Sequence, residues 1–316
     1  MAKGGIFMSL KKRLLFIIPI AIIIIAGLLW INTGKSYADS YKEIPPAYEE
    51  NSVVKVGDHY FRCAFENGNT VVQMSDKKSS GYEDIFTGVS PDYWTNGRVI
   101  YTTVQNDKGN WSLVKYSISK DKVTKLIGKL PNKLIYDEYD AYNVSKIYGK
   151  YVYLIRSSFY GWGYKLYRYD MKTGKLKKIM NDCAIDWSKG KYVLGINEFQ
   201  TDVSAHKKTL YEIQSDGALK KTKLLGKHVM SYGVAGNYLY YEKCTDSSGK
   251  KATIYRIKPD GTGKKKLGDL ETKEEFGQVF CYNYTSKYCY VNGLDYSGTD
   301  CAYKYIYKTK ELKKVS

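Results

Sequence analysis

Short runs of alternating apolar and polar residues, separated by turns, dominate the chain after residue 46. A turn residue with a bulky apolar or aromatic residue four positions later recurs six times, and a turn that leads into such a run is typical of a strand start. The six occurrences are Gly57–Phe61, Gly97–Tyr101, Gly149–Tyr153, Gly190–Leu194, Gly236–Tyr240 and Ser286–Tyr290. This pattern predicts a tandem array of strands.

Each occurrence is followed by two further predicted strands and preceded by a fourth, so the repeat is a four-stranded unit. The second strands are predicted at residues 70–75, 112–117, 165–170, 209–214, 253–258 and 303–308. The third strands, most of them rich in lysine, are predicted at residues 82–86, 122–127, 175–180, 220–225, 264–269 and 311–316. Four antiparallel strands repeated every 40 to 52 residues are typical of a β-propeller blade. We therefore expect an all-β, six-bladed propeller of four-stranded antiparallel blades over residues 47–316, with a β-solenoid as the alternative.

The N-terminal segment has a different pattern. Lys11, Lys12 and Arg13 precede eighteen uncharged residues, 14–31, and a run of that length can cross a membrane as a helix. Because a basic flank stays on the cytoplasmic side, we expect a cytoplasmic tail at residues 1–13, a transmembrane anchor or uncleaved signal at 14–31 and an extracytoplasmic propeller.

Residues 32–46, which include Pro45 and Pro46, are predicted to be a tether between the anchor and the propeller. Small residues at Ser36 and Ala38 also fit a signal-peptidase site, so a protein secreted after cleavage following Ala38 is the alternative.

Composition supports the strand prediction and adds a positive charge. The 316 residues include 33 tyrosines, and tyrosine favours strands. Five of the 50 basic residues and none of the 32 acidic ones precede Asp39, so the remainder carries a net charge of +13. Such a charge attracts polyanions, and outside the cytoplasm an anionic cell-wall polymer or lipid headgroups are the expected partners rather than nucleic acid.

The stretch Gly261-Thr262-Gly263-Lys264 looks like a phosphate-binding loop. Such a loop needs a helix after it, whereas the residues that follow continue as a lysine-rich strand. Since Asp260-Gly261 is a hairpin signal, we interpret this stretch as a turn before the outermost strand of the fifth unit. Lysines on an outer strand protect an open sheet edge from aggregation, and contact with an anionic polymer is the functional alternative.

The fifth unit, residues 236–269, carries a resemblance to a known family. Leu239-Tyr240-Tyr241, Ile254-Tyr255-Arg256 and Asp260-Gly261 match the order of a tyrosine-rich strand, an "IYR" strand and a "DG" turn. In this the chain resembles uncharacterised bacterial propellers related to the YWTD propeller of low-density-lipoprotein-receptor-related proteins. The resemblance implies a six-bladed propeller that binds or displays and no particular activity. The literal "YWTN" of residues 93–96 lies on a different strand of its unit and does not contribute to it.

Acidic and aromatic residues gather just ahead of several first strands. In a propeller these connections face one mouth of the central channel, where carboxylates beside aromatic rings suit a cationic or sugar-like ligand or a calcium ion. The alternative is that they are solvated loop acids and buried aromatics. The candidate binding residues are Asp92, Tyr93, Trp94, Asp137, Glu138, Asp140, Asp182, Asp186 and Trp187.

Catalytic motifs are absent from the sequence. His59, His206 and His228 share no metal-ligand spacing, and neither HExxH nor GxSxG occurs. We expect no catalytic residue, no metal site and no cofactor. Among the cysteines, Cys289 could form a disulfide with Cys281 or with Cys301, or all three could be buried thiols.

The sequence thus predicts a non-catalytic, membrane-tethered binding or interaction module outside the cytoplasm. Its expected partners are the membrane, an anionic envelope polymer or an envelope protein. A glycan-acting enzyme with acidic and aromatic residues at the channel mouth is the alternative.

Overall fold

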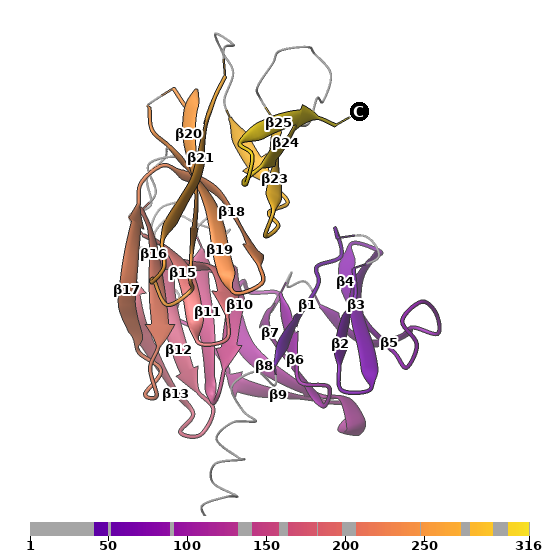
Figure 1. Ribbon diagram of the computed structural model, residues 1–316. Helices are drawn as coiled ribbons and strands as arrows, with labels where there is room; N and C mark the ends of the chain where they lie inside the picture. The colour runs from indigo at the N-terminus through magenta and orange to yellow at the C-terminus, as the bar shows by residue number, and fades with distance from the viewer. Residues whose placement is uncertain are drawn as a thin grey trace, which may run out of the picture.

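The computed structural model describes residues 41–49, 52–88, 92–131, 141–157, 164–181, 183–197, 207–246, 248–272, 279–292 and 303–315. Within these ranges the chain forms 25 strands in six antiparallel sheets (Figure 1). Five sheets have four strands and one has five, and the four strands of each repeat are neighbours in chain order. The all-β class and the six-unit repeat predicted from the sequence are confirmed.

The sheets are named blades one to six in chain order. Blade one contains β2 (Val54–Val56), β3 (His59–Glu66), β4 (Asn69–Ser75) and β5 (Glu83–Gly88). Blade two contains β1 (Lys42–Ile44), β6 (Tyr93–Thr95), β7 (Val99–Gln105), β8 (Trp111–Ser117) and β9 (Lys122–Ile127), with a 3-10 turn at Ile118–Lys120. Blade three contains β10 (Ala141–Tyr148), β11 (Tyr151–Ser157), β12 (Lys165–Asp170) and β13 (Lys175–Asn181).

The second half of the chain repeats this order. Blade four contains β14 (Cys183–Lys189), β15 (Tyr192–Asn197), β16 (Lys207–Ile213) and β17 (Leu219–Gly226). Blade five contains β18 (Val229–Ala235), β19 (Tyr238–Cys244), β20 (Lys251–Ile257) and β21 (Lys265–Glu271). Blade six contains β22 (Phe280–Tyr282), β23 (Tyr288–Asn292), β24 (Tyr303–Ile306) and β25 (Glu311–Lys314).

The repeated turn residue closes the first hairpin of each blade. Gly149 and Gly236 have φ values of 57° and 58°, a left-handed conformation that glycine adopts without a steric penalty. The apparent phosphate loop is the hairpin between β20 and β21, where Gly261 N donates to Lys258 O and Lys258 N donates to Thr262 O. It therefore turns the chain, and the outermost strand β21 follows it, as predicted.

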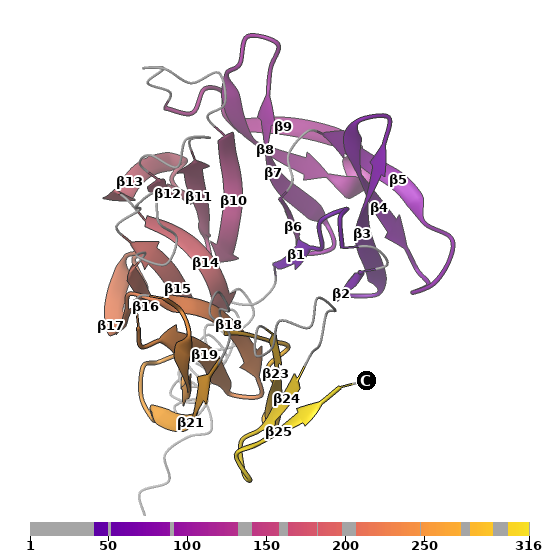
Figure 2. The same cartoon turned by 90° about the horizontal axis from the view of Figure 1, so that it is seen from above.

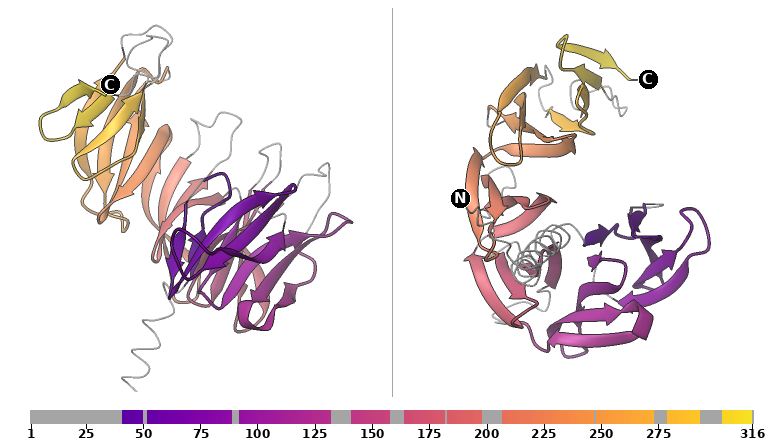
Figure 3. Two further views of the ribbon diagram at one scale, coloured as in Figure 1. Left: turned by 90° about the vertical axis from the view of Figure 1, so that its right-hand side faces the viewer. Right: turned by 60° about the horizontal axis from the view of Figure 1, so that its bottom comes forward.

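Five apolar clusters join successive blades. The residues of each cluster come from two neighbouring sheets: blades one and two, two and three, three and four, four and five, and five and six. A single sheet cannot bury both of its faces, so the core of this protein lies between the blades. In Figures 2 and 3 the blades follow one another around an arc, with blade one (indigo) and blade six (yellow) at its two ends.

The predicted tether requires a correction. Residues 32–46 were expected to connect anchor and propeller, but residues 42–44 form β1, which pairs with β6 through Lys42 with Thr95, Glu43 with Trp94 and Ile44 with Tyr93. Ile44 is 1% exposed and packs in the cluster between blades one and two, which provides the driving force for this pairing.

The predicted transmembrane segment, residues 14–31, lies outside the described residues. Within the ranges that the structure describes, no helix has the length and apolar character needed to cross a membrane.

Candidate functional site

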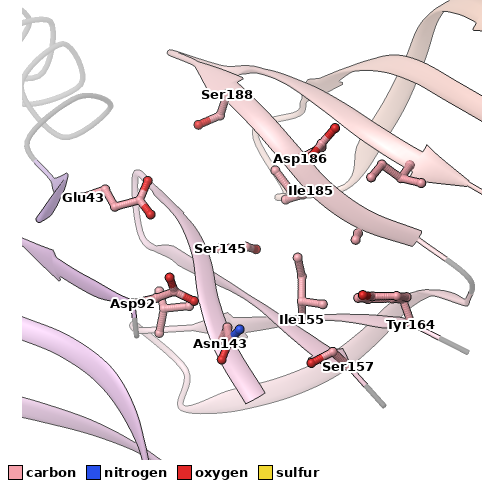
Figure 4. Close-up of a pocket in the computed structure, with 13 residues that line it drawn as sticks. Glu43, Asp92, Asn143, Ser145, Ile155, Ser157, Tyr164, Ile185, Asp186 and Ser188 are labelled. Carbon is pink, nitrogen blue, oxygen red and sulfur yellow. The ribbon is translucent and has the colours of Figure 1, made fainter. Parts of the chain in front are cut away.

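The inner strands of blades two, three and four surround a cavity of about 460 Å³ (Figure 4). Its polar lining comprises three carboxyl groups, one amide and four hydroxyl groups: Glu43, Asp92, Asp186, Asn143, Ser145, Ser157, Tyr164 and Ser188. Its apolar lining includes Ile155, Ile185 and Ile196. This combination of carboxylates, hydroxyls and apolar patches suits a small polar ligand that has both hydrogen-bonding groups and a hydrocarbon face.

Two β-bulges provide part of this lining. The pairing of β10 with β11 shifts between Val144 and Lys146, and that of β14 with β15 shifts between Ile185 and Trp187. Ser145 and Asp186 are the extra residues of these bulges, and a bulge re-aims a side chain that regular alternation would place elsewhere. Both therefore line the cavity beside residues of their own strands.

Glu43 and Asp92 lie together on the blade two side of the cavity, and Asp186 lies across from them (Figure 4). Burial raises the pKa of Asp92 to about 6. Burial, followed by repulsion from Asp92 and Glu49, raises the pKa of Glu43 to about 7, and Lys146 opposes this shift. Solvent reaches part of the Glu43 side chain, and this water screens the repulsion from Asp92 and Glu49. The pair therefore changes its charge close to neutral pH.

Asp186 is held by groups from blades four and five. Its carboxylate forms an ion pair with Lys208 at 3.2 Å, and the Lys208 ammonium lies 4.5 Å from the centre of the Tyr232 ring. The Tyr232 hydroxyl donates to the backbone oxygen of Asp186 at 3.2 Å. These contacts hold the bulge and the Asp186 carboxyl group in place at the cavity wall.

Asn143 offers an unused acceptor. Within the described part of the chain, its Oδ1 is buried and accepts no hydrogen bond. A buried polar atom of this kind normally has a hydrogen-bond partner, so a hydroxyl or amine of a ligand would donate a hydrogen bond to it.

The structure brings two of the predicted site residues, Asp92 and Asp186, to one cavity. Tyr93 and Trp94 do not line it: Tyr93 packs between blades one and two, and Trp94 packs between blades two and three. The inter-blade cores bury these two rings to 0% and 4% exposure, as in the alternative of buried aromatics, and neither ring faces this cavity. The remaining predictions, Asp137, Glu138, Asp140, Asp182 and the side chain of Trp187, lie outside the described residues.

Sequence reasoning missed Glu43, Asn143 and Ser145. Glu43 was assigned to the tether, and only its pairing with Trp94 shows that it belongs to blade two. Asn143 and Ser145 belong to a strand whose apolar alternation breaks at Lys146, and that break is the one local signal of the bulge.

Among the described residues, no group of three or more His, Cys, Asp and Glu side chains could hold a metal ion. Cys281 and Cys289 are buried free thiols, and Cys301 lies outside the described residues. A hydrogen bond between the Cys281 and Cys289 thiols, and then burial, raise the pKa of Cys281 well above its ordinary value, so this thiol stays protonated.

No protein-family model and no curated protein matches the chain. Among solved structures, an uncharacterised protein from Listeria monocytogenes is similar, with a TM-score of 0.46, 13% identity and coverage of 84% of this chain and 83% of that one. An oligogalacturonate lyase in complex with manganese has a TM-score of 0.47 and 14% identity, and the match covers 87% of this chain and 78% of the lyase chain. The β-propeller domain of the Trilobed protease from Pyrococcus furiosus has an open velcro topology. Its TM-score is 0.47 at 8% identity, and the match covers 84% of this chain and 83% of that domain. At such low identity, the three structures are similar to this chain in their propeller fold alone.

Proposed function

We propose that the protein is a non-catalytic binding module, tethered to a membrane outside the cytoplasm, and that it binds a small hydroxylated cation in the cavity between blades two, three and four. The observation that carries this proposal is the lining of that cavity. Three carboxyl groups from two blades line this cavity, together with the amide of Asn143 and four hydroxyl groups. A ligand with an ammonium group and several hydroxyls, such as an amino sugar, matches these donors and acceptors.

The apolar part of the lining supports a sugar-like shape. Ile155, Ile185 and Ile196 contribute surface that cannot hydrogen-bond, so a ligand needs a hydrocarbon face as well as polar edges. A pyranose ring has both.

The tether and the outer strands supply the rest of the proposal. Residues 14–31, the uncharged run that follows Lys11, Lys12 and Arg13, would hold the module at the membrane. Exposed lysines on β9, β13 and β17, the outermost strands of their blades, would contact an anionic envelope polymer. A several-fold loss of polymer binding between low and high salt tests that contact, and binding that ignores salt contradicts it.

A glycan-acting enzyme is the second candidate, and the pair of Glu43 and Asp92 favours it. Two neighbouring carboxyl groups with pKa values of about 7 and about 6 could act as a proton donor and an acceptor near neutral pH. Release of reducing ends from wall glycan by the full chain, lost on Asp92→Asn, would support this candidate over a binding module.

The first test measures ligand preference by calorimetry on the full chain in detergent. We expect an oligomer of glucosamine to bind about ten-fold more tightly than its N-acetylated counterpart, because acetylation removes the charge that the carboxylates attract. Asp92→Asn should reduce that affinity about ten-fold. Asp107→Asn removes the same charge from an exposed turn of the same blade and should leave the affinity unchanged. Equal affinity for the two oligomers would contradict the proposal.

The second test uses the pH dependence of binding, with choline as a probe whose charge is constant. Below the raised pKa values of Asp92 and Glu43, about 6 and about 7, both carboxyl groups are protonated and attract a cation weakly. Affinity for choline should therefore rise about ten-fold from pH 5 to pH 8, and the double variant Glu43→Gln, Asp92→Asn should flatten this rise. An affinity that is independent of pH in the unmodified protein would show that these carboxyl groups do not face the cation.

A further inference from the structure

A second cavity, of about 520 Å³, lies where the hairpins of blades four and five turn beside the end of β10. We call it the turn-side cavity, and its lining includes Tyr148, Lys189, Tyr192, Asn237, Lys258 and Asp260. The cavity between blades two, three and four is lined by other residues, most of them from the opposite ends of the same strands. The two cavities are therefore separate candidates for binding.

Between blades three and four, a hairpin fills the corresponding place. This hairpin joins β16 to β17 in blade four, and its backbone oxygens accept hydrogen bonds from blade three. The Tyr153 hydroxyl donates to Gly217 O at 3.0 Å, and the Arg168 guanidinium donates to Asp216 O. These donors hold the hairpin of blade four against blade three.

The β20–β21 hairpin of blade five has the same form as the β16–β17 hairpin. In each, the residue before the turn exchanges backbone hydrogen bonds with the third and fourth residues after it: Gln214 with Gly217 and Ala218, and Lys258 with Gly261 and Thr262. Lys258 therefore occupies the position that Gln214 occupies one blade earlier.

The donors that hold such a hairpin are missing from blade four. Tyr153 and Arg168 pair across β11 and β12, and Leu194 and Leu210 occupy the same positions across β15 and β16. Among the six copies of the recurring bulky residue, Leu194 is the one that is not aromatic. A leucine side chain has no hydrogen-bond donor, so neither leucine can bridge to the hairpin of blade five. The turn-side cavity lies beside this unbridged hairpin.

Positive charge prevails in the cavity. Its described lining contains three ammonium groups, of Lys189, Lys191 and Lys258, and one carboxylate, of Asp260. Lys191 forms an ion pair with Glu212 outside the lining. Lys189 donates to a neutral backbone oxygen, and within the described part of the chain the Lys258 ammonium has neither an ion pair nor a hydrogen bond. Two of the three ammonium groups are thus available to an anion.

Asp260 offsets one of these charges and already has hydrogen-bond partners. Its Oδ1 accepts from Thr262 Oγ1 at 2.7 Å and from Thr262 N at 2.8 Å, and these bonds lower the pKa of its carboxyl group. Neighbouring lysines add positive charge: burial, and then repulsion from Lys243 and Lys223, lowers the pKa of Lys264 at the end of the same hairpin. An anion would relieve this repulsion.

The rest of the lining suits a ring that carries hydroxyl groups. Tyr148 and Tyr192 are half-buried, and with Pro259 they provide apolar surface for the hydrocarbon face of such a ring. The Asn237 side chain is exposed at the turn between β18 and β19, and its amide can both donate and accept a hydrogen bond.

We propose that the turn-side cavity binds a sugar that carries a carboxylate or a phosphate group. The anionic group meets Lys189 and Lys258, and the ring packs on Tyr148 and Tyr192. This inference does not rest on the cation proposed for the other cavity, because the two cavities share none of their described lining residues.

Calorimetry on the full chain in detergent tests the ligand class. Glucuronate and glucose differ only in the carboxylate, and we expect glucuronate to bind about ten-fold more tightly, because charge-assisted hydrogen bonds to lysine are the stronger ones. Acetate has the charge without the ring and should bind at least about ten-fold more weakly than glucuronate. Glucuronate that binds no more tightly than glucose, or no more tightly than acetate, would overturn the proposal.

Glucose 6-phosphate distinguishes the two anionic groups. Tighter binding than that of glucuronate assigns the cavity to a phosphorylated sugar, and weaker binding assigns it to a sugar acid. Binding of neither compound would refute both assignments.

A matched pair of lysine variants tests the position of the site. Lys258→Gln introduces the residue that blade four has at the same place in its hairpin, so the turn keeps its form, and it should weaken glucuronate binding about ten-fold. Lys172→Gln removes the same charge from the exposed hairpin between β12 and β13 and should leave the affinity unchanged. Equal losses in the two variants would show that glucuronate responds only to the total charge.

Asn237→Trp tests the cavity itself, because it fills space from an exposed turn and leaves every charge in place. It should abolish glucuronate binding, with a thermal transition like that of the unmodified protein, and retained binding in the folded variant would contradict the site. Asp92→Asn alters the other cavity and should change glucuronate affinity by less than about two-fold. A ten-fold loss in Asp92→Asn would instead place the sugar acid in that cavity, so the two proposals can fail separately.

Discussion

Replacing Trp94 by alanine should destabilise the protein by about 3–5 kcal/mol, the range for truncating a large buried aromatic side chain. Trp94 is 4% exposed and packs in the cluster that joins blades two and three. Its Nε1 donates to Val144 O of blade three at 2.8 Å, and the ammonium group of the buried Lys146 lies 5.4 Å from its ring. The variant loses apolar contacts and leaves both a buried carbonyl and a buried ammonium without this neighbour.

Urea denaturation followed by circular dichroism measures this loss. Trp94→Phe is the matched variant, because it keeps most of the ring volume and removes the donor, and we expect it to cost about 1–2 kcal/mol. A loss below about 1 kcal/mol for Trp94→Ala would show that blades two and three do not depend on this contact.

Replacing Gly268 by alanine should cost about 2–4 kcal/mol, because the site is already filled. A Cβ atom on Gly268 would overlap the hydroxyl oxygen of Tyr305, its nearest neighbour, and would lie 2.6 Å from Cζ and 2.9 Å from Cε1 of the same ring, distances that real Cβ atoms do not adopt. Tyr305 is 2% exposed and packs between blades five and six, so its ring cannot move into solvent without opening that cluster. The expected consequence is a loosened interface between these two blades.

The partner variant Tyr305→Phe separates this clash from other effects of the new methyl group. Removing the hydroxyl should recover part of the loss in the double variant, which gives a favourable coupling energy in a double-mutant cycle. Gly128→Ala is the control, since its Cβ would meet nothing within 4 Å and its stability should change by less than about 0.5 kcal/mol. A Gly268→Ala protein as stable as the Gly128→Ala protein would contradict the close packing of blades five and six.

The sequence was sufficient for the repeat and for the order of strands within it. Turn residues such as Gly149 and Gly236 take the left-handed conformation where the pattern requires a hairpin. Asp260-Gly261 closes the β20–β21 hairpin, and lysine-rich segments such as β13 and β17 are outermost in their sheets. These features depend on residues close together in the chain, so local pattern and turn chemistry encode them.

Only the tertiary structure decided which of these residues form a site. Glu43 joins the cavity because Ile44 is buried between two blades, a contact that no local pattern records. Ser145 and Asp186 line it because bulges re-aim them, whereas Tyr93 and Trp94 are drawn into the inter-blade cores. Whether a strand residue faces the channel or a neighbouring blade depends on packing between units that are tens of residues apart in the chain. The alternation of apolar and polar residues within one unit does not show which of its faces the neighbouring unit covers.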